Sequence, residues 1–148
     1  MSIEENARIA SELHAAMNNR DVDKAMSLFA DDASYIVMPG GTCYTKVDIR
    51  KYFEKIMKIY EKFILRDIHP PVVSGSMLTH EYTIEAKLRN GPEGFIPAVV
   101  VIELSNGKIS QVRSYIDKLE AAKQMGRGFL EKWIVAVVAK RVAALTSP

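Results

Sequence analysis

The stretch Leu104–Gly126, LSNGKISQVRSYIDKLEAAKQMG, decides the fold. Asn106-Gly107 stands between two alternating apolar runs, which is a strong signal for a two-residue hairpin turn because both turn positions need a positive φ. After this turn, residues 109–116 are expected to form a strand, and Asp117 begins an Asp-x-x-Glu pattern that is typical of a helix start. A strand that passes directly into a helix predicts a small curved sheet wrapped by helices, and hence a pocket.

Length and composition narrow the class of protein. A chain of 148 residues fits a single domain, 1–148, that can bury a sizeable core. The formal net charge of +2 is too close to balance to favour a nucleic acid or an anionic membrane as a partner. The single cysteine excludes an internal disulfide framework, and the first residues lack a secretory signal, so we expect a cytoplasmic protein. The uncharged apolar run Trp133–Ala139 is too short to span a bilayer.

The sequence pattern of the first half of the chain predicts mainly helices. Residues 2–17 carry an amphipathic pattern, in which His14 falls between apolar positions and is expected to be solvated. A short second helix over 22–29, ending at Ala30-Asp31-Asp32, precedes an apolar strand over 33–38. Thr45 is a candidate cap for a third helix whose apolar stripe extends to Phe63. A row of lysines follows another side of this helix and is interpreted as a solvated face.

The sequence pattern of the second half predicts mainly strands. Residues 80–88 alternate, with His80 and Tyr82 on the face expected to be buried. The run Phe95–Leu104 is so apolar that we expect a central strand covered on both faces. Residues 129–145 form a further amphipathic pattern, so the core is expected over about 5–125 with a C-terminal helical extension over 126–146. The broad apolar surface of this extension would lie under the domain, over the pocket mouth or against a second subunit.

Three groups of residues carry a resemblance to a known family: residues 28–33 (LFADDA), Ile96-Pro97 before the apolar strand, and residues 107–117 (GKISQVRSYID). In these motifs and in the order of its elements, the chain resembles the nuclear-transport-factor-2-like superfamily. Within it, the chain is similar to the SnoaL-like group, which includes polyketide cyclases and the limonene-epoxide-hydrolase type. The resemblance implies an α+β fold: a cone-shaped domain in which helices cover a curved mixed sheet, with an apolar pocket and frequent dimers through the sheet.

The epoxide-hydrolase chemistry implied by the resemblance uses two carboxylates and an arginine to activate a water. One carboxylate position is matched by Ser114, whose hydroxyl cannot act as that base. The arginine and the other carboxylate are matched by His80 and Tyr82 or by Glu81 and Thr83, and neither register restores the pair. We therefore expect this chemistry to be lost in that form.

Two other chemistries of the family differ in how well the residues of this sequence match them. The ketosteroid-isomerase type needs an aspartate on the strand where this chain has Tyr35–Met38, which contains no acid. The cyclase type, which enolises a carbonyl substrate with an acid/base residue and a helper, is the least excluded. His80 is then the candidate base, and Tyr82 or Tyr35 could donate to an enolate oxygen. Asp117 is a third catalytic candidate, with a helix N-cap as its structural alternative.

The remaining candidates would line a ligand pocket. We expect an apolar small-molecule ligand, no nucleic acid, no membrane, a homodimer, and no metal or other cofactor, because the histidines show no metal-ligand spacing. Two functions stay open: a cofactor-free acid/base enzyme (isomerase, cyclase or hydratase type), and a non-catalytic binding or dimerisation module. The candidate ligand-binding residues are Tyr35, Val37, Tyr44, Tyr52, Val100, Arg113, Ser114 and Tyr115.

Overall fold

The computed structural model describes residues 2–38, 42–126, 128, 134–138 and 140, without the side chains of residues 42 and 43. Its helices are α1 (Ile3–Asn18), α2 (Val22–Ser27), α3 (Lys46–Ile59) and α4 (Lys118–Met125), and residues 134–138 are also helical. Its strands are β1 (Phe29–Met38), β2 (Thr42–Thr45), β3 (Tyr60–Asp67), β4 (Val72–Ser74), β5 (Met77–Leu88), β6 (Glu93–Ser105) and β7 (Lys108–Ile116).

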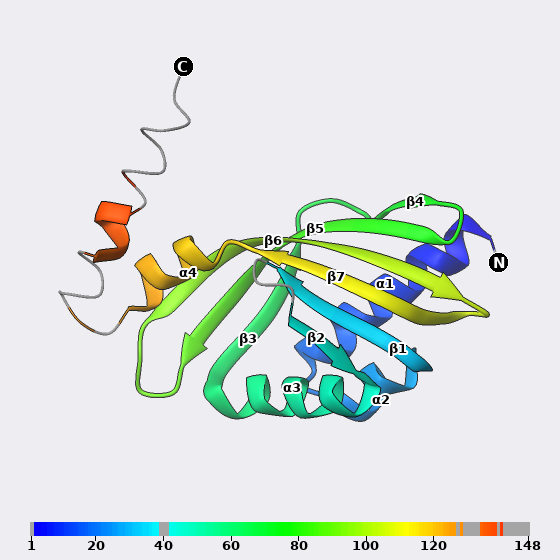
Figure 1. The fold of residues 1–148 in the computed structure, drawn as a ribbon, viewed down its shortest axis with the longest axis horizontal. Coiled ribbons are helices and arrows are strands. Elements are labelled where there is room, and N and C mark those ends of the chain that lie inside the picture. Colours follow the sequence, from blue (N-terminus) through cyan, green and yellow to red (C-terminus); the bar gives the residue numbers. More distant parts are fainter. Residues whose placement is uncertain (1, 39–41, 127, 129–133, 139, 141–148) are drawn as a thin grey trace, which may run out of the picture.

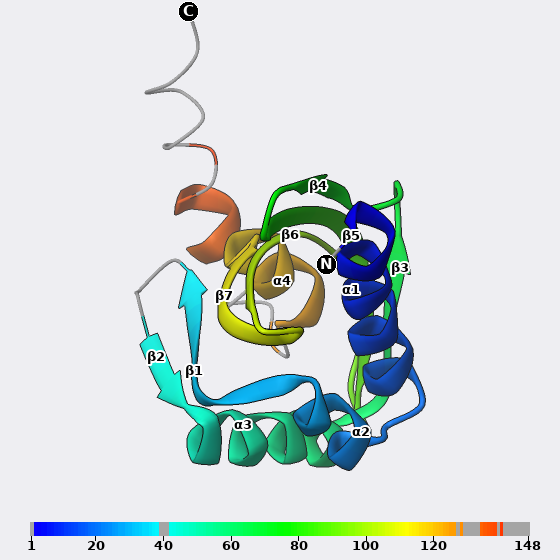
Figure 2. The ribbon, with the colours of Figure 1, turned by 90° about the vertical axis from the view of Figure 1, so that its right-hand side faces the viewer.

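The strands of the described residues form one mixed sheet in the order β2-β1-β7-β6-β5-β3, with β4 beside the first part of β5. Among the described strands, the β1–β7 pair alone is parallel. The sheet is strongly curved, and helices α1, α2 and α3 lie around its open side (Figures 1 and 2). This is the expected α+β cone. No helix among the described residues is both long and apolar enough to cross a membrane.

Local signals at both ends of β7 act as expected. Asn106 and Gly107 have φ of 50° and 76° and join β6 to β7. At the other end, Asp117 Oδ1 accepts a hydrogen bond of 2.8 Å from the Glu120 backbone N–H and caps α4. The deciding stretch therefore folds as a hairpin strand followed by a capped helix.

The core fills the concave face of the sheet. Alternating residues of β5, β6 and β7 point inward and meet the apolar stripes of α1 and α3. The largest side chains with less than 2% of their area exposed include Phe29, Ile49 and Ile102. Burying a side chain of this size contributes about 1.5–3 kcal/mol, so the helices are held to the sheet mainly by apolar burial.

Two helix ends differ from the sequence expectations. Helix α2 ends at Ser27, and the chain already enters β1 at Phe29, which pairs with Ile109 of β7. Helix α3 ends at Ile59, and the rest of the expected stripe, from Tyr60, belongs to strand β3, which pairs with β5. In both places pairing with a distant strand overrides a local helical pattern.

Strand β6 is central, as expected, but the prediction that both its faces are covered is wrong. Burial alternates along it, and Phe95 on the outer face is 51% exposed. Strand β7 contains a register shift opposite Glu103 and Leu104, so that Ile109 and Val112 are both buried although they lie three residues apart. After this irregularity, Ser114 faces the interior and Tyr115 is exposed.

Candidate active site

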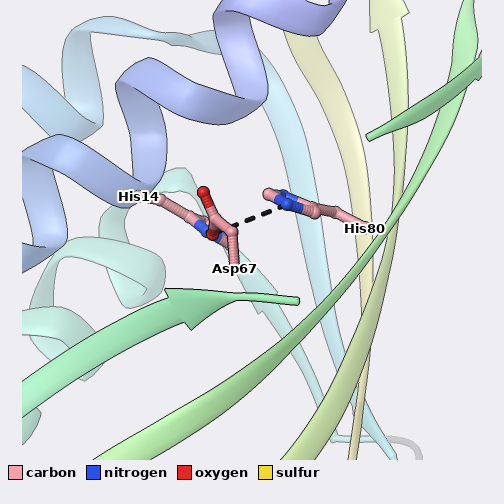
Figure 3. Close-up of side chains that lie close together, drawn as sticks. All are labelled: His14, Asp67 and His80. Atoms are coloured by element: carbon pink, nitrogen blue, oxygen red, sulfur yellow. Dashed lines mark hydrogen bonds and ion pairs between the residues drawn. The ribbon is translucent and has the colours of Figure 1, made fainter. Parts of the chain in front are cut away.

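Helix α1 places a histidine in the wall of the cone. His14 lies within the apolar stripe of α1 and is 4% exposed. Its Nδ1 is 2.6 Å from Asp67 Oδ1 at the end of β3 (Figure 3). An ionised carboxylate only accepts hydrogen bonds, so Nδ1 carries the proton and donates it to Asp67. The other ring nitrogen, Nε2, then holds a lone pair and is the ring nitrogen that can accept a proton.

A second histidine lies against the first. His80 of β5 is 1% exposed, and its ring stacks on that of His14 with 4.5 Å between centroids and 12° between planes. His80 Nε2 donates to the His69 carbonyl oxygen at 3.0 Å and lies 3.5 Å from Asp67 Oδ1. Its Nδ1 is buried and has no hydrogen-bond partner among the described residues. The His80 ring therefore packs against one face of the His14 ring.

The surroundings of His14 favour its neutral form. Burial lowers the pKa of His14, the hydrogen bond to Asp67 opposes part of this effect, and the neighbouring His80 lowers the pKa further. Asp67 itself remains 47% exposed. A neutral imidazole with its Nδ1–H fixed on a carboxylate has the arrangement of a general base at neutral pH.

The same three side chains are the candidate metal ligands of the described residues, because their ligand atoms lie within 4.8 Å of one another. The ring geometry opposes this use. An imidazole binds a metal in its own plane at about 2.1 Å, and two nearly parallel rings that overlap face to face cannot both point at one ion. The 2.6 Å contact is also shorter than the edge of about 3.3 Å between two ligands of a tetrahedral metal. The cluster is arranged as a hydrogen-bonded stack.

His14 lines a cavity of about 50 Å³ inside the cone. The wall is mainly apolar, with residues of α1, α3 and strands β1, β3, β5, β6 and β7. Its polar groups besides His14 are the side chains of Tyr35, Tyr52, Tyr82 and Ser114. A few polar groups converging in an apolar cavity are typical of a small-molecule site.

The hydroxyls in this cavity are kept protonated. Burial raises the pKa of Tyr82 to about 12, and it also raises the pKa of Tyr35 and Tyr52. The Ser114 hydroxyl opposes part of the rise at Tyr35 and Tyr82, yet Ser114 Oγ is buried without a hydrogen-bond partner among the described residues. Oγ thus lies near both phenols but outside hydrogen-bonding geometry. The cavity contains hydroxyl donors and one unsatisfied hydroxyl.

The sequence model of the SnoaL-like domain matches residues 10–112. The chain belongs to the SnoaL-like family. Among curated proteins, none matches this SnoaL-like chain.

Solved structures show the same fold at low sequence identity. A proposed polyketide cyclase from Xanthomonas campestris pv. campestris is 18% identical, with a TM-score of 0.76 over 82% of this chain and 97% of that one. An LEH-like epoxide hydrolase from M. tuberculosis is 19% identical, with a TM-score of 0.70 over 93% and 98%. A protein with a ketosteroid-isomerase-like fold from Catenulispora acidiphila, in complex with trimethylamine, is 18% identical, with a TM-score of 0.74 over 80% and 92%. These likenesses show that the chain shares the fold of these three structures.

The structure of this SnoaL-like protein brings some of the predicted site residues together. Tyr35, Tyr52, Tyr82, Val100 and Ser114 all line the interior cavity. Ser114, which matches the hydrolase carboxylate position, is thus a cavity residue.

Three further candidates lie away from the cavity. His80 is buried behind His14 and does not line the cavity. Val37 is buried elsewhere in β1, and Tyr44 lies in an outer groove beside α3.

The three remaining candidates, Arg113, Tyr115 and Asp117, do not line the interior cavity. Arg113 donates to Glu103 Oε1 at 2.6 Å. Tyr115 is 43% exposed and lines an outer groove together with Asp117, the α4 cap. The predicted extension over 126–146 lies largely outside the described residues.

The sequence interpretation missed His14 and Asp67. The expectation that His14 is solvated is wrong, because the α1 stripe continues over it from Ala10 to Met17. That position, four residues after one apolar residue and three before another, was the available signal. Nothing local marked Asp67 as its partner, 53 residues away.

Proposed function

We propose that this SnoaL-like protein is a cofactor-free acid/base enzyme that enolises a small apolar carbonyl compound, with His14 as the general base. One observation carries the proposal: His14 donates its Nδ1 proton to Asp67 and lines the interior cavity. The cavity also holds the hydroxyls of Tyr82, Tyr35 and Ser114. This combines a base with donors for an oxyanion, which enolisation requires.

Enolisation itself needs one proton transfer. His14 Nε2 takes a proton from the carbon next to the carbonyl, and the electron pair of that C–H bond forms a carbon–carbon double bond. The carbonyl π electrons move to oxygen, where a phenol hydroxyl donates a hydrogen bond to the enolate. Return of the proton from the imidazolium to another carbon completes an isomerisation. In a cyclisation, attack of the enolate carbon on a second carbonyl forms a carbon–carbon bond and an alkoxide, and the imidazolium then protonates this alkoxide.

Each neighbour of His14 has a role in this scheme. Asp67 fixes the Nδ1–H tautomer and stabilises the imidazolium that forms when Nε2 takes the proton. Tyr82, which also contacts the His14 ring edge at 4.7 Å between centroids, is the first candidate to donate to the enolate oxygen. Its pKa of about 12 keeps it protonated at neutral pH. His80 holds the His14 ring in place by stacking and takes the role of a positioning residue.

A second function is favoured by the size of the cavity. About 50 Å³ accommodates one or two water molecules of about 30 Å³ each, whereas sites for drug-sized ligands span about 300–1,000 Å³. So small a free volume inside the cone favours a non-catalytic module that binds a ligand or a second copy of the chain through another surface. The two functions differ in whether a carbonyl group reaches His14.

Exchange of carbon-bound protons separates these functions. We would incubate 2-tetralone with the protein in heavy water and follow loss of its α-proton NMR signals. The enzyme function predicts exchange above the buffer rate, lowered by about 100-fold or more in His14→Gln and unchanged in His69→Gln, whose side chain is exposed outside the cavity. Exchange at the buffer rate, or equal exchange in His14→Gln, would reject His14 as the base.

A further inference from the structure

We propose that the groove beside α3 is the outer half of the ligand site, and that Tyr52 and Ile56 form the gate between this groove and the interior cavity. The groove has a volume of about 600 Å³. Tyr52 and Ile56 are the two residues that line both the groove and the cavity. This inference rests on the proposed function for the identity of the inner end of the ligand, a carbonyl group.

Volume is the first argument for a gate. The inner cavity holds little more than a carbonyl group, while the groove alone has the size of a small-molecule site. A ligand whose reacting end lies beside His14 must therefore extend outward, and the groove is separated from the cavity by the side chains of Tyr52 and Ile56. Both side chains are only partly buried, so a rotamer change of each can join the two spaces.

The groove wall indicates an aromatic ligand. The rings of Tyr44 and Tyr52 stack with 5.0 Å between centroids and 15° between planes, and Tyr44 lines the groove. Tyr60 and Ile59 complete an apolar wall at the far end of α3. Flat apolar groups pack well on aromatic faces, so a fused-ring or aryl body fits this surface.

The charges around the groove indicate an anionic outer end. Lys51 and Lys55 line the groove together with one carboxylate, Asp48. Asp48 lies 3.8 Å from Lys51 and accepts a hydrogen bond from the Thr45 hydroxyl. Lys55 has no acidic partner among the residues that the structure describes. The groove therefore favours an aromatic ketone that carries a carboxylate at the end opposite its carbonyl.

Binding of two matched probes tests the ligand class. Titration calorimetry would compare 6-acetyl-2-naphthoate with its neutral analogue 2-acetylnaphthalene. The wild type is expected to bind the carboxylate about two- to fivefold more tightly, a preference lost in Lys55→Gln and kept in Lys58→Gln, which lies outside the groove. Equal affinity for both probes, or equal loss in both variants, would overturn the assignment of an anionic ligand.

Stopped-flow naphthalene fluorescence tests the gate. Ile56→Ala is expected to raise the association rate of 6-acetyl-2-naphthoate about fivefold or more by removing gate atoms, and the milder Ile56→Val is expected to raise it less. Ile59→Ala removes atoms from the groove but not from the gate, and should lower affinity without faster association. Equal association rates in wild type, Ile56→Ala and Ile56→Val would overturn the gate.

These measurements are independent of catalysis. If the preference for the carboxylate probe and the faster association of Ile56→Ala are both observed while 2-tetralone shows no proton exchange, the groove and gate are supported and the acid/base function fails. If exchange occurs while Lys55→Gln and Ile56→Ala bind as the wild type does, the acid/base function stands and the groove is not the outer half of the site.

Discussion

His14 Nδ1 and Asp67 Oδ1 lie 2.6 Å apart and join the C-terminal half of helix α1 to the end of edge strand β3. This contact fixes the tautomer of a buried imidazole at the wall of the cone. Replacing Asp67 by Asn removes the carboxylate but keeps the size of the side chain. We expect 2-tetralone exchange in Asp67→Asn to fall by about tenfold or more, because the neutral amide stabilises the imidazolium less well. The NMR exchange rate measures this; an unchanged rate would show that Asp67 does not act through His14.

The buried His14 also links stability to acidity. Its pKa is lowered in the folded protein below the ordinary value of 6.5, so the unfolded chain binds a proton more readily. This contribution is therefore fully present above pH 6.5 and is lost as the pH falls through the folded pKa, by at most about 1.4 kcal/mol per pH unit. Urea unfolding at several pH values should show a smaller loss in His14→Gln. Parallel pH curves for wild type and variant would contradict this linkage.

Asn18 anchors α1 to β3 one turn after His14. Its side-chain NH2 donates to the Leu65 carbonyl at 3.0 Å, and its Oδ1 accepts from the Leu65 N–H at 2.7 Å. Asn18→Ala removes both hydrogen bonds of a partly buried edge strand and should lower the free energy of unfolding by about 1–3 kcal/mol. The exposed neighbour Asn19 provides a control, with an expected change below about 0.5 kcal/mol for Asn19→Ala. Similar losses in both variants would show that the Leu65 contact is not the cause.

Ser114 and Ser110 form an informative pair on β7. Ser114 Oγ is buried without a hydrogen-bond partner in the part of the chain that the structure describes, whereas Ser110 Oγ donates to the Glu103 carbonyl at 3.1 Å. Ser114→Ala should leave the free energy of unfolding unchanged or raise it by up to about 1 kcal/mol, while Ser110→Ala should lower it by about 0.5–1.5 kcal/mol. Urea denaturation of the two variants measures both effects. A clear loss in Ser114→Ala would show that its hydroxyl is satisfied in solution.

The features that the sequence predicted well are those that local chemistry controls. The Asn106-Gly107 turn and the Asp117 cap need only their own neighbours, and both formed as expected. The boundary between α3 and β3 could not be predicted in this way, because Tyr60 continues the helical stripe as well as it begins a strand. Its pairing with Leu88 of β5 decides the outcome, and that contact is not local.

In the candidate site, too, features that depend on local sequence could be predicted, and features that depend on distant contacts could not. Tyr82 could be placed inward from its strand by alternation, whereas alternation did not show which face of β7 is buried, because a register shift interrupts it. The partnership of His14 with Asp67 could not, because it depends on how α1 crosses the edge of the sheet. The alternation of β5 predicted an inward His80, which is correct, but gave no sign that His14 covers it.

The pH profile of proton exchange tests the central claim, that neutral His14 is the base, most directly. The rate of 2-tetralone exchange, corrected for buffer, would be measured from about pH 4.5 to pH 8 in wild type, Asp67→Asn and His14→Gln. The rate is expected to rise with pH, to reach half its maximum below pH 6.5 because burial lowers the pKa of His14, and then to stay level. The step should disappear in His14→Gln. A midpoint above pH 6.5, or the same step in His14→Gln, would show that neutral His14 is not the base.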